Sequence, residues 1–158
     1  GASLQTFSKH DISFQVSNQL KLEEYTLDLA RQISRRGSTG YDQGVVMSSE
    51  RNFILEWVYE PQFTAQLARA QVLNGPAFFE SSDPSFSASI AGNPQTKRIS
   101  SVEVTFAEME VVFSSGSRAP GIIGVWQCQP SKRAIIFIAL HKQPTQELER
   151  FASSFSCR

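Results

Sequence analysis

The stretch IIGVWQCQPSKRAIIFIAL, residues 122–140, does most to decide the fold of this chain. It contains two apolar runs, residues 122–127 and 134–140, and the Gln-Pro-Ser segment at residues 129–131 between them is typical of a turn. The second run does not alternate between apolar and polar residues, so we expect a strand that is covered on both faces. The stretch therefore predicts two adjacent strands in the centre of a sheet.

The preceding sequence predicts further strands. Residues 45–47 and 53–59 are apolar runs separated by a short polar segment, which predicts a hairpin. The second of these runs has apolar residues at both parities, so we expect it to be covered on both faces as well. Residues 12–16 and 86–90 alternate between apolar and polar side chains, which predicts two half-buried strands. We expect the Gly-Asn-Pro segment at residues 92–94 to turn the chain after the last of them.

Residues 99–113 form a long β segment in which the parity of the apolar side chains changes. The apolar residues are Val102, Val104 and Phe106, followed by Met109, Val111 and Phe113. A regular strand cannot present both sets to one core face, because alternate side chains point to opposite faces. We therefore expect a β-bulge, or a tight turn, within residues 107–109.

Two segments have helical patterns. Proline suits a first helical turn, and the apolar spacing that follows Pro61 predicts a helix over residues 61–74. The Asn-Gly-Pro segment at residues 74–76 predicts the end of this helix. A second helix is predicted to begin at Pro144, with a buried stripe formed by Leu148, Phe151 and Phe155.

Residues 20–36 fit a helical face and strand alternation almost equally, and we favour a helix for part of this segment. Two or three helices are too few for a parallel sheet built from βαβ units. Hairpins with helices at intervals instead predict an α+β fold, a mainly antiparallel sheet with helices packed on both faces. Residues 1–158 contain neither a repeat nor a linker, so we predict a single domain.

Composition excludes several classes of function. The chain has 158 residues, and its 15 Lys and Arg residues balance 15 Asp and Glu residues. Nucleic-acid binding rests on a basic footprint, which a chain of zero net charge does not provide. No segment approaches the roughly 20 apolar residues that a membrane span requires. The hydrophobic content of 41% indicates an ordinary globular domain.

Residues that could carry chemistry are scarce. A zinc site would need His10, His141, Cys128 and Cys157 to converge, and their spacing matches no metal-binding motif. The sequence also lacks a phosphate-binding loop and a nucleophile elbow. We therefore predict no catalytic residue, no cofactor-binding residue and no metal ligand.

Two pairs of charged residues allow a functional and a structural interpretation. Glu108 and Glu110 share a strand face and could in principle act as paired carboxylates, but no cleft is indicated around them, so we interpret them as a solvated face. Lys132 and Arg133 follow a turn in an otherwise neutral chain. We interpret this basic pair as a loop or strand end in water.

The order of elements carries a resemblance to a known family. Its parts are an early strand with Phe14, the strand Phe53–Tyr59 with its tryptophan, Pro61 directly after it, the late hairpin with GVWQC (residues 124–128) and RAII (residues 133–136), and the ending SFSC (residues 154–157). This pattern resembles the PsbP-like domains over nearly the whole chain. The resemblance implies an α/β/α sandwich, a fold that these domains share with a yeast Ran-binding nuclear-import factor.

The resemblance also implies a class of function. Plant and cyanobacterial members are non-enzymatic extrinsic subunits of photosystem II, and many prokaryotic members are exported or lipid-anchored. We therefore predict a non-enzymatic, exported or lipid-anchored binding or assembly module that docks onto a membrane-associated protein partner. No functional residue is transferred. The alternatives are a small-ligand carrier with a pocket between sheet and helix, and an enzyme.

The two cysteines provide a link to localisation. Two cysteines suffice for one bridge, and a small exported domain is where a bridge persists, so we predict a Cys128–Cys157 disulfide. Cys157 lies off the apolar stripe of the last helix, so the helix must end near residue 155 or 156 for the bridge to form. The alternative is two buried free thiols in a cytoplasmic protein. The sequence begins with Gly1 rather than methionine, and we expect that an upstream leader has been removed.

Overall fold

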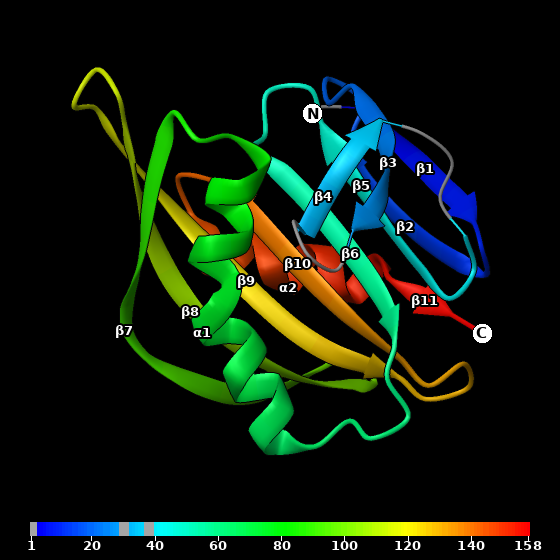
Figure 1. Cartoon of the computed structure of the whole chain (residues 1–158). Coiled ribbons are helices and arrows are strands. Elements are labelled where there is room, and N and C mark those ends of the chain that lie inside the picture. Colours follow the sequence, from blue (N-terminus) through cyan, green and yellow to red (C-terminus); the bar gives the residue numbers. More distant parts are fainter. Residues whose placement is uncertain (1–2, 29–31, 37–39) are drawn as a thin grey trace.

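The computed structural model describes residues 3–28, 32–36 and 40–158, and within these residues it contains two antiparallel sheets and two helices (Figure 1). The large sheet has the strand order β4-β3-β5-β6-β10-β9-β8-β7. Its strands are β3 (Leu22–Asp28), β4 (Gln32–Arg36), β5 (Gln43–Ser48), β6 (Phe53–Tyr59), β7 (Phe86–Ile99), β8 (Val102–Phe113), β9 (Arg118–Cys128) and β10 (Arg133–Leu140). The remaining elements are β1 (Leu4–Lys9), β2 (Ile12–Ser17) and β11 (Ser156–Cys157) of the small sheet, and the helices α1 (Ala65–Ser82) and α2 (Pro144–Ser154).

The stretch of residues 122–140 forms the centre of the large sheet, as predicted. β9 and β10 are joined by an unbroken antiparallel ladder from Cys128–Arg133 to Gly121–Leu140. The other edge of β10 pairs with β6, and β6 pairs with β5 in the predicted hairpin. All residues of β10 except Leu140 are buried, because both faces of this strand are covered.

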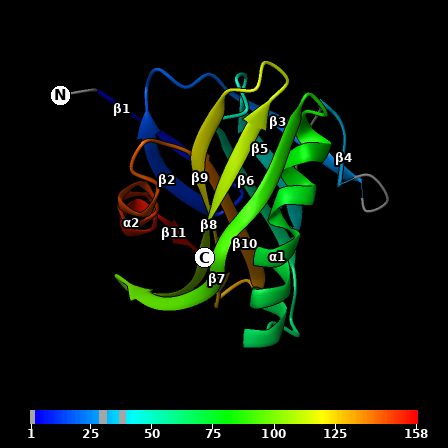
Figure 2. The ribbon, with the colours of Figure 1, turned by 90° about the vertical axis from the view of Figure 1, so that its left-hand side faces the viewer.

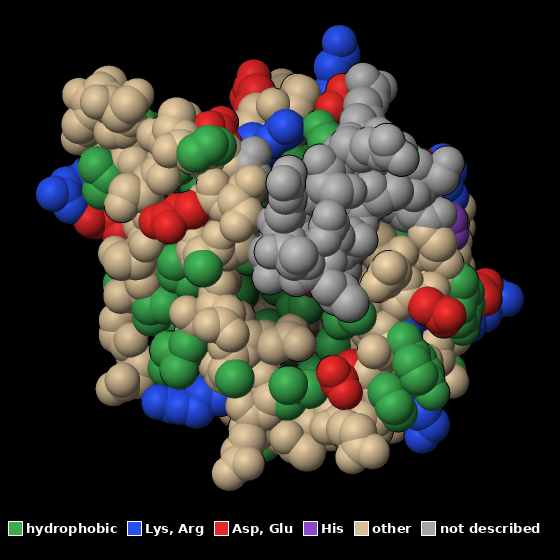
Figure 3. All heavy atoms as spheres, in the orientation of Figure 1, with side chains coloured by type: hydrophobic (Ala, Val, Ile, Leu, Met, Phe, Trp, Pro, Cys, Tyr) green, Lys and Arg blue, Asp and Glu red, His purple; other side chains and the backbone are tan. Residues whose placement is uncertain are grey.

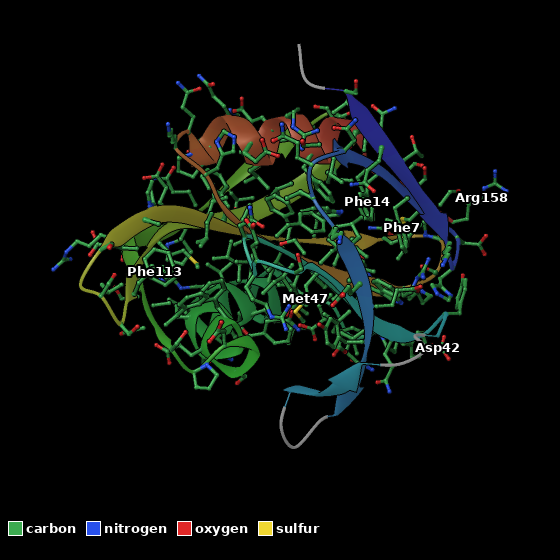
Figure 4. All side chains as sticks on the ribbon, turned by 90° about the horizontal axis from the view of Figure 1, so that it is seen from above. Phe7, Phe14, Asp42, Met47, Phe113 and Arg158 are labelled. Atoms are coloured by element: carbon green, nitrogen blue, oxygen red, sulfur yellow. A yellow bond between two sulfur atoms is a disulfide. The ribbon has the colours of Figure 1, made fainter. Side chains whose placement is uncertain are left out.

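Buried side chains form two clusters, divided by strand parity. One, the α2-side cluster, combines Leu55 and Trp57 of β6 with Phe151 of α2. The other, the α1-side cluster, combines Ile54 of β6 with Phe79 of α1. In Figure 2 the strands lie between the two helices. Figure 4 shows Phe14 on the side nearer α2 and Met47 on the side nearer α1.

Part of the sequence between residues 20 and 36 was expected to be helical, and this expectation is wrong for the described residues. Residues 22–28 and 32–36 form β3 and β4. The edge of β5 decides the outcome, because it offers a ladder to β3 from Leu22–Ser48 to Tyr25–Val45. Propensity is a weak prior that such tertiary pairing overrides. Residues 29–31 lie outside the described residues.

Helix α1 begins and ends later than predicted. Its N-cap is Thr64, whose Oγ1 accepts a hydrogen bond from the Leu67 N–H at 3.1 Å. The predicted stop at residues 74–76 is wrong, because α1 continues through Pro76 to Ser82. Two side chains beyond the proline, Phe78 and Phe79, are buried in the α1-side cluster. Burying them offsets the roughly 3 kcal/mol that an interior proline costs.

The parity change in β8 requires no bulge in that strand, so this prediction is also wrong. The β8–β9 ladder runs without a break from Thr105–Val125 to Val112–Arg118. Residues 102, 104 and 106 contribute to the α2-side cluster, whereas residues 107, 109 and 111 contribute to the α1-side cluster. The two apolar sets point to opposite faces of a regular strand, and each face is covered.

The irregularity lies in the neighbouring edge strand. Residues 92–94 of β7 lie opposite Ala107 alone, since Ala91 pairs with Glu108 and Gln95 pairs with Phe106. The predicted turn at residues 92–94 is therefore a bulge within one continuous strand. Gly92 has a φ of +84° there, a conformation that glycine adopts at low cost.

The chain after β10 follows the prediction closely. α2 begins at Pro144, and Leu148 and Phe151 are buried on its inner face. Phe155 ends the helix in an extended conformation, and Ser156 and Cys157 then pair with β2 as β11. Cys157 is joined to Cys128 by a disulfide with a Cα–Cα distance of 6.1 Å. Neither described helix has the length and apolar character needed to span a membrane.

Candidate functional site

The histidines and cysteines do not come together. Both sulfur atoms belong to the disulfide, and so neither is a thiolate ligand. His10 lies 3.4 Å from a carboxylate oxygen of Glu24, and His141 lies 3.5 Å from one of Glu147. Among the described residues, no group of three or more His, Cys, Asp or Glu side chains is placed to hold a metal ion.

The two glutamates of β8 have separate partners. Glu108 accepts a hydrogen bond from the Thr145 hydroxyl at 3.0 Å, and Glu110 forms an ion pair with Arg118. The first contact links the sheet to α2, and the second links β8 to β9. These partners support the structural interpretation of the pair over paired acid–base chemistry.

Arg133 is the residue whose environment the sequence interpretation misplaced. It was expected at a strand end in water, but it is completely buried at the start of β10. Its guanidinium group stacks over the Tyr41 ring, 4.2 Å from the centroid. Its hydrogen bonds go to the backbone oxygens of His10 (2.7 Å), Tyr41 (2.9 Å), Arg158 (3.2 Å) and Asp11 (3.4 Å), and to Ser131 Oγ (2.6 Å).

This arrangement makes Arg133 a connector between segments that are distant in sequence. Burial lowers the pKa of the guanidinium group, while Tyr41, Asp11 and Asp42 act in the opposite direction. The guanidinium group nevertheless stays charged, because an arginine is not deprotonated in proteins. The only local signal in the sequence was its position directly before an apolar strand, which does not distinguish a buried arginine from an exposed one.

Glu56 is a second buried ionisable group that the sequence analysis did not single out. It lies in β6 between Val45 of β5 and Ile136 of β10, and 8% of its surface is exposed. Burial raises the pKa of its carboxyl group to about 7. A signal was present, because Glu56 shares its strand face with Ile54 and Val58, and this face was predicted to be covered.

An open cleft occurs where the large sheet separates at one end. The β8–β9 ladder stops at Thr105–Val125. Residues 102–104 continue to pair with β7, and residues 126–128 continue to pair with β10, but the two segments do not pair with each other. Each segment therefore has one strand edge outside the ladder. We call the space between these edges the β8–β9 cleft.

Bending of the β7–β8 hairpin accounts for this separation. Figure 2 shows β7 bending from the side of α1 toward the side of α2. The bulge at residues 92–94 lies within the bent strand, and bulges increase strand twist. Beyond the bulge, Lys97 forms an ion pair with Glu149. This contact links the bent end of the hairpin to α2. β9 instead follows β10, so the two hairpins diverge.

The cleft has a volume of about 550 Å³ and is lined by residues from four segments. These are Phe63, Thr64, Ala65 and Ala68 at the start of α1; Arg98, Ser101, Val102, Glu103 and Thr105 of the β7–β8 hairpin; Gln127, Cys128, Gln129 and Pro130 at the end of β9; and Phe155, Ser156 and Cys157 at the C-terminal end. The disulfide therefore forms part of its wall. No single stretch of sequence could have predicted this site, because the four segments meet only in the folded chain.

The charges beside the cleft offset each other. Arg98 and Glu103 are both exposed and face each other in the β7–β8 ladder. The first turn of α1 contains no acidic residue, and its Thr64 cap is uncharged. Figure 3 shows basic and acidic side chains scattered over the face that it presents, without a gathering of one sign. These features do not favour a strongly charged ligand.

A second, smaller hollow of about 410 Å³ involves β8, β9 and β10 together with the β5–β6 turn. Its lining includes Phe113, Pro120, Leu140 and His141. Here the β8–β9 and β9–β10 ladders continue to Val112–Arg118 and Gly121–Leu140. The β8–β9 cleft is therefore the stronger candidate, because it combines a larger volume with strand edges outside the ladder.

Comparisons with known proteins agree with this fold. No protein-family model and no curated protein matches the sequence. Among solved structures, the chain has the fold of the PsbP-like domains, as the sequence predicted. One similar structure is the solution structure of cyanobacterial PsbP (CyanoP) from Synechocystis sp. PCC 6803, with a TM-score of 0.57 and 16% identity over 100% of this chain and 94% of that one.

A crystal structure from Bacteroides thetaiotaomicron VPI-5482 is also similar, with a TM-score of 0.47 and 8% identity. The match covers 98% of this chain and 48% of that one. Similarity at this level supports no functional argument. The comparison with CyanoP, at 16% identity, establishes the fold alone.

Proposed function

We propose that this chain is a non-enzymatic binding or assembly module that acts outside the cytoplasm and docks onto a membrane-associated protein partner. The observation that carries the proposal is the β8–β9 cleft, an open site with strand edges outside the ladder, in which the opposite charges of Arg98 and Glu103 offset each other. Such edges are sites where another chain can pair. The PsbP-like fold agrees with this role, because the cyanobacterial protein of similar structure is named as a PsbP.

Two features support the finer parts of the proposal. The Cys128–Cys157 disulfide supports a place outside the cytoplasm, since disulfides persist in oxidising compartments. In this proposal the helices cover opposite faces of the large sheet as an α/β/α sandwich, which the division of buried side chains between two clusters supports. The covered faces leave the open end of the sheet for docking.

The second candidate function is a small-ligand carrier. It is favoured by the volume of the β8–β9 cleft, which lies within the roughly 300–1,000 Å³ of small-molecule sites, and by its position between α1 and the sheet. Against it, the cleft is open to solvent, and five polar or charged residues of its lining, Thr64, Arg98, Ser101, Glu103 and Gln129, are exposed. A carrier site is usually concave, enclosed and mostly apolar.

Site-specific photo-crosslinking in cells of the source organism tests the docking function. Ala65 and Ala70 are both exposed alanines of α1, but only Ala65 lines the cleft. A crosslinker at position 65 should repeatedly capture one membrane-associated protein, and a crosslinker at position 70 should not. Capture at both positions alike would contradict docking at this cleft. Native mass spectrometry should show no retained small molecule, and a stoichiometric one would establish the carrier instead.

Thiol labelling in the same cells tests the location. Protein trapped with acid and then treated with a high-mass maleimide should show no mass shift unless it is first reduced. A shift without reduction would place the chain in a reducing compartment and contradict export.

A further inference from the structure

We propose that the β8–β9 cleft binds an extended, uncharged peptide segment of the partner as an added β-strand between β8 and β9. This inference rests on the proposed function and names the chemistry of what docks. It depends on three features of the cleft: its two strand edges, its access to both faces of the sheet, and its balance of charge.

The first feature is that both walls of the gap are strand edges. Residues 102–104 use one edge for β7, and residues 126–128 use one edge for β10. In an antiparallel strand, alternate residues direct their N–H and C=O groups to opposite neighbours. Some backbone donors and acceptors of each segment therefore face the gap. An inserted strand could pair with both edges at once, which an ordinary sheet edge does not allow.

The second feature is that the cleft is lined from both faces of the sheet. Val102 and Cys128 have the parity of the α2-side cluster. Thr105 and Gln127 have the opposite parity and point toward the side where Ala68 of α1 lies. A hollow on one face would be lined by one parity only. The cleft therefore extends into the gap between the strands, where an added strand would lie.

The third feature sets the side chains that fit. On the α2 side, an inserted residue would meet Val102, Phe155 and the disulfide; on the α1 side, it would meet Phe63 and Ala68. These surfaces suit apolar side chains at alternate positions on both faces. Arg98 and Glu103 of the lining have opposite charges that offset each other, so an added charge gains nothing. Residues 102 and 103 of β8 and residues 127 and 128 of β9 line the cleft beyond the end of the β8–β9 ladder, so an inserted strand would pair over two residues on each side, about 7 Å.

The free protein provides the first test. Backbone amides of residues 102–104 and 126–128 that face the gap should exchange with solvent faster than amides of the β9–β10 ladder, when followed residue by residue by NMR. Uniformly strong protection of both segments in the free protein would mean that the gap is closed, and this would overturn the proposal.

A displayed library of seven-residue segments, built from Ala, Val, Ile, Leu, Thr and Ser, provides the second test. The folded protein should enrich members of the library. The variant Ala65→Trp, which places a large ring in the cleft, should not, whereas Ala70→Trp should enrich as the parent does. Failure of the parent to enrich any segment, or equal enrichment by both variants, would overturn the proposal.

Backbone methylation separates strand addition from side-chain capture. An enriched peptide should shift amide resonances of residues 102–104 and 126–128, and methylation of its alternate backbone nitrogens should weaken binding by about tenfold or more through lost hydrogen bonds. Equal affinity after methylation at either set of alternate nitrogens would contradict an added strand. Shifts confined to the smaller hollow beside Phe113 would also contradict it.

The proposed function can survive failure of this inference. If crosslinking at residue 65 captures a partner but extended peptides from that partner do not bind, docking stands and strand addition is wrong. If self-association of the chain, measured by sedimentation, is abolished by Ala65→Trp alone, the occupant is a second copy and the partner peptide is excluded.

Discussion

The two neighbours of β9 differ at the same end of the sheet. On the β10 side, the ladder is complete to Cys128–Arg133. The buried guanidinium group of Arg133 there donates hydrogen bonds to the loops that contain His10, Tyr41 and Ser131, and to the C-terminal residue Arg158. On the β8 side, the ladder stops three residues earlier, and a cleft opens. β9 therefore has a closed side, where pairing with β10 continues to its end, and an open side, where pairing with β8 stops and the cleft lies. The disulfide lies at the boundary between them.

On the closed side, we expect the largest loss of stability from a substitution of Arg133. Arg133→Met removes every hydrogen bond of the guanidinium group and leaves several backbone oxygens without their donor. We expect the free energy of unfolding to fall by about 4 kcal/mol, because bonds to a charged group contribute roughly 1.5–3 kcal/mol each and are not additive. Urea unfolding at pH 7 measures the change.

The adjacent Lys132 provides the control, because it is exposed. Lys132→Met should change the stability by less than about 0.5 kcal/mol. If Arg133→Met costs no more than Lys132→Met, the closed side does not depend on this residue and the comparison fails.

The boundary is tested by removing the disulfide. Cys128→Ser combined with Cys157→Ser should lower the free energy of unfolding by about 3.5 kcal/mol, the chain-entropy cost of a loop spanning 29 residues. Reduction of the parent protein should have a similar effect, and reductant should not affect the double variant. Thermal unfolding with and without reductant distinguishes these cases.

The disulfide and Arg133 should also be coupled. Both hold the C-terminal segment, since Arg158 accepts a hydrogen bond from Arg133 and follows Cys157 directly. A variant that combines Arg133→Met with Cys128→Ser and Cys157→Ser should therefore lose less stability than the sum of the losses measured for Arg133→Met and for the double cysteine variant. Strict additivity would show that the two act on independent parts of the molecule.

The pH dependence of stability tests whether Glu56 is buried on the closed side. Its pKa is about 7 in the folded protein against 4.5 ordinarily, so the folded state binds the proton more tightly. Stability is therefore highest at or below about pH 4.5 as far as this group is concerned, falls as the pH rises toward 7, and is level above that. Glu56→Gln should remove this dependence and stabilise the protein at pH 8 by about 3 kcal/mol.

The exposed Glu50 provides the matched substitution. Glu50→Gln should leave the fall in stability between pH 4.5 and 7 unchanged. If Glu56→Gln leaves it unchanged too, the carboxylate of Glu56 is solvated and does not belong to the closed side.

The smallest effect is expected on the open side. Gln129 lines the cleft and is exposed, so Gln129→Ala should change the free energy of unfolding by less than about 0.5 kcal/mol. Amide exchange in residues 126–128 should stay at least as fast as in the parent. A loss as large as that of Arg133→Met would show that the open side is also part of the stabilising frame.

Much of the fold could be predicted because its signal is local. The runs at residues 122–127 and 134–140, the β5–β6 hairpin and the start of α2 at Pro144 all follow from spacing along a single segment. The predicted disulfide is also present, and its pairing could be predicted because two cysteines allow only one bridge. The candidate site could not be predicted in this way. Its four segments are brought together by a bend in β7 and by the point at which a ladder ends.

The sequence by itself determined which segments are apolar, where most strands lie, and that chemistry-bearing residues are few. Only the tertiary structure decided that residues 22–28 become a strand, that α1 continues past Pro76, and that Arg133 is buried while Lys132 is exposed. The physical reason is the range of the interactions. Periodicity reports on neighbours within a turn or a strand, whereas backbone pairing with β5, packing of Phe79 and capture of distant backbone oxygens depend on partners that folding supplies.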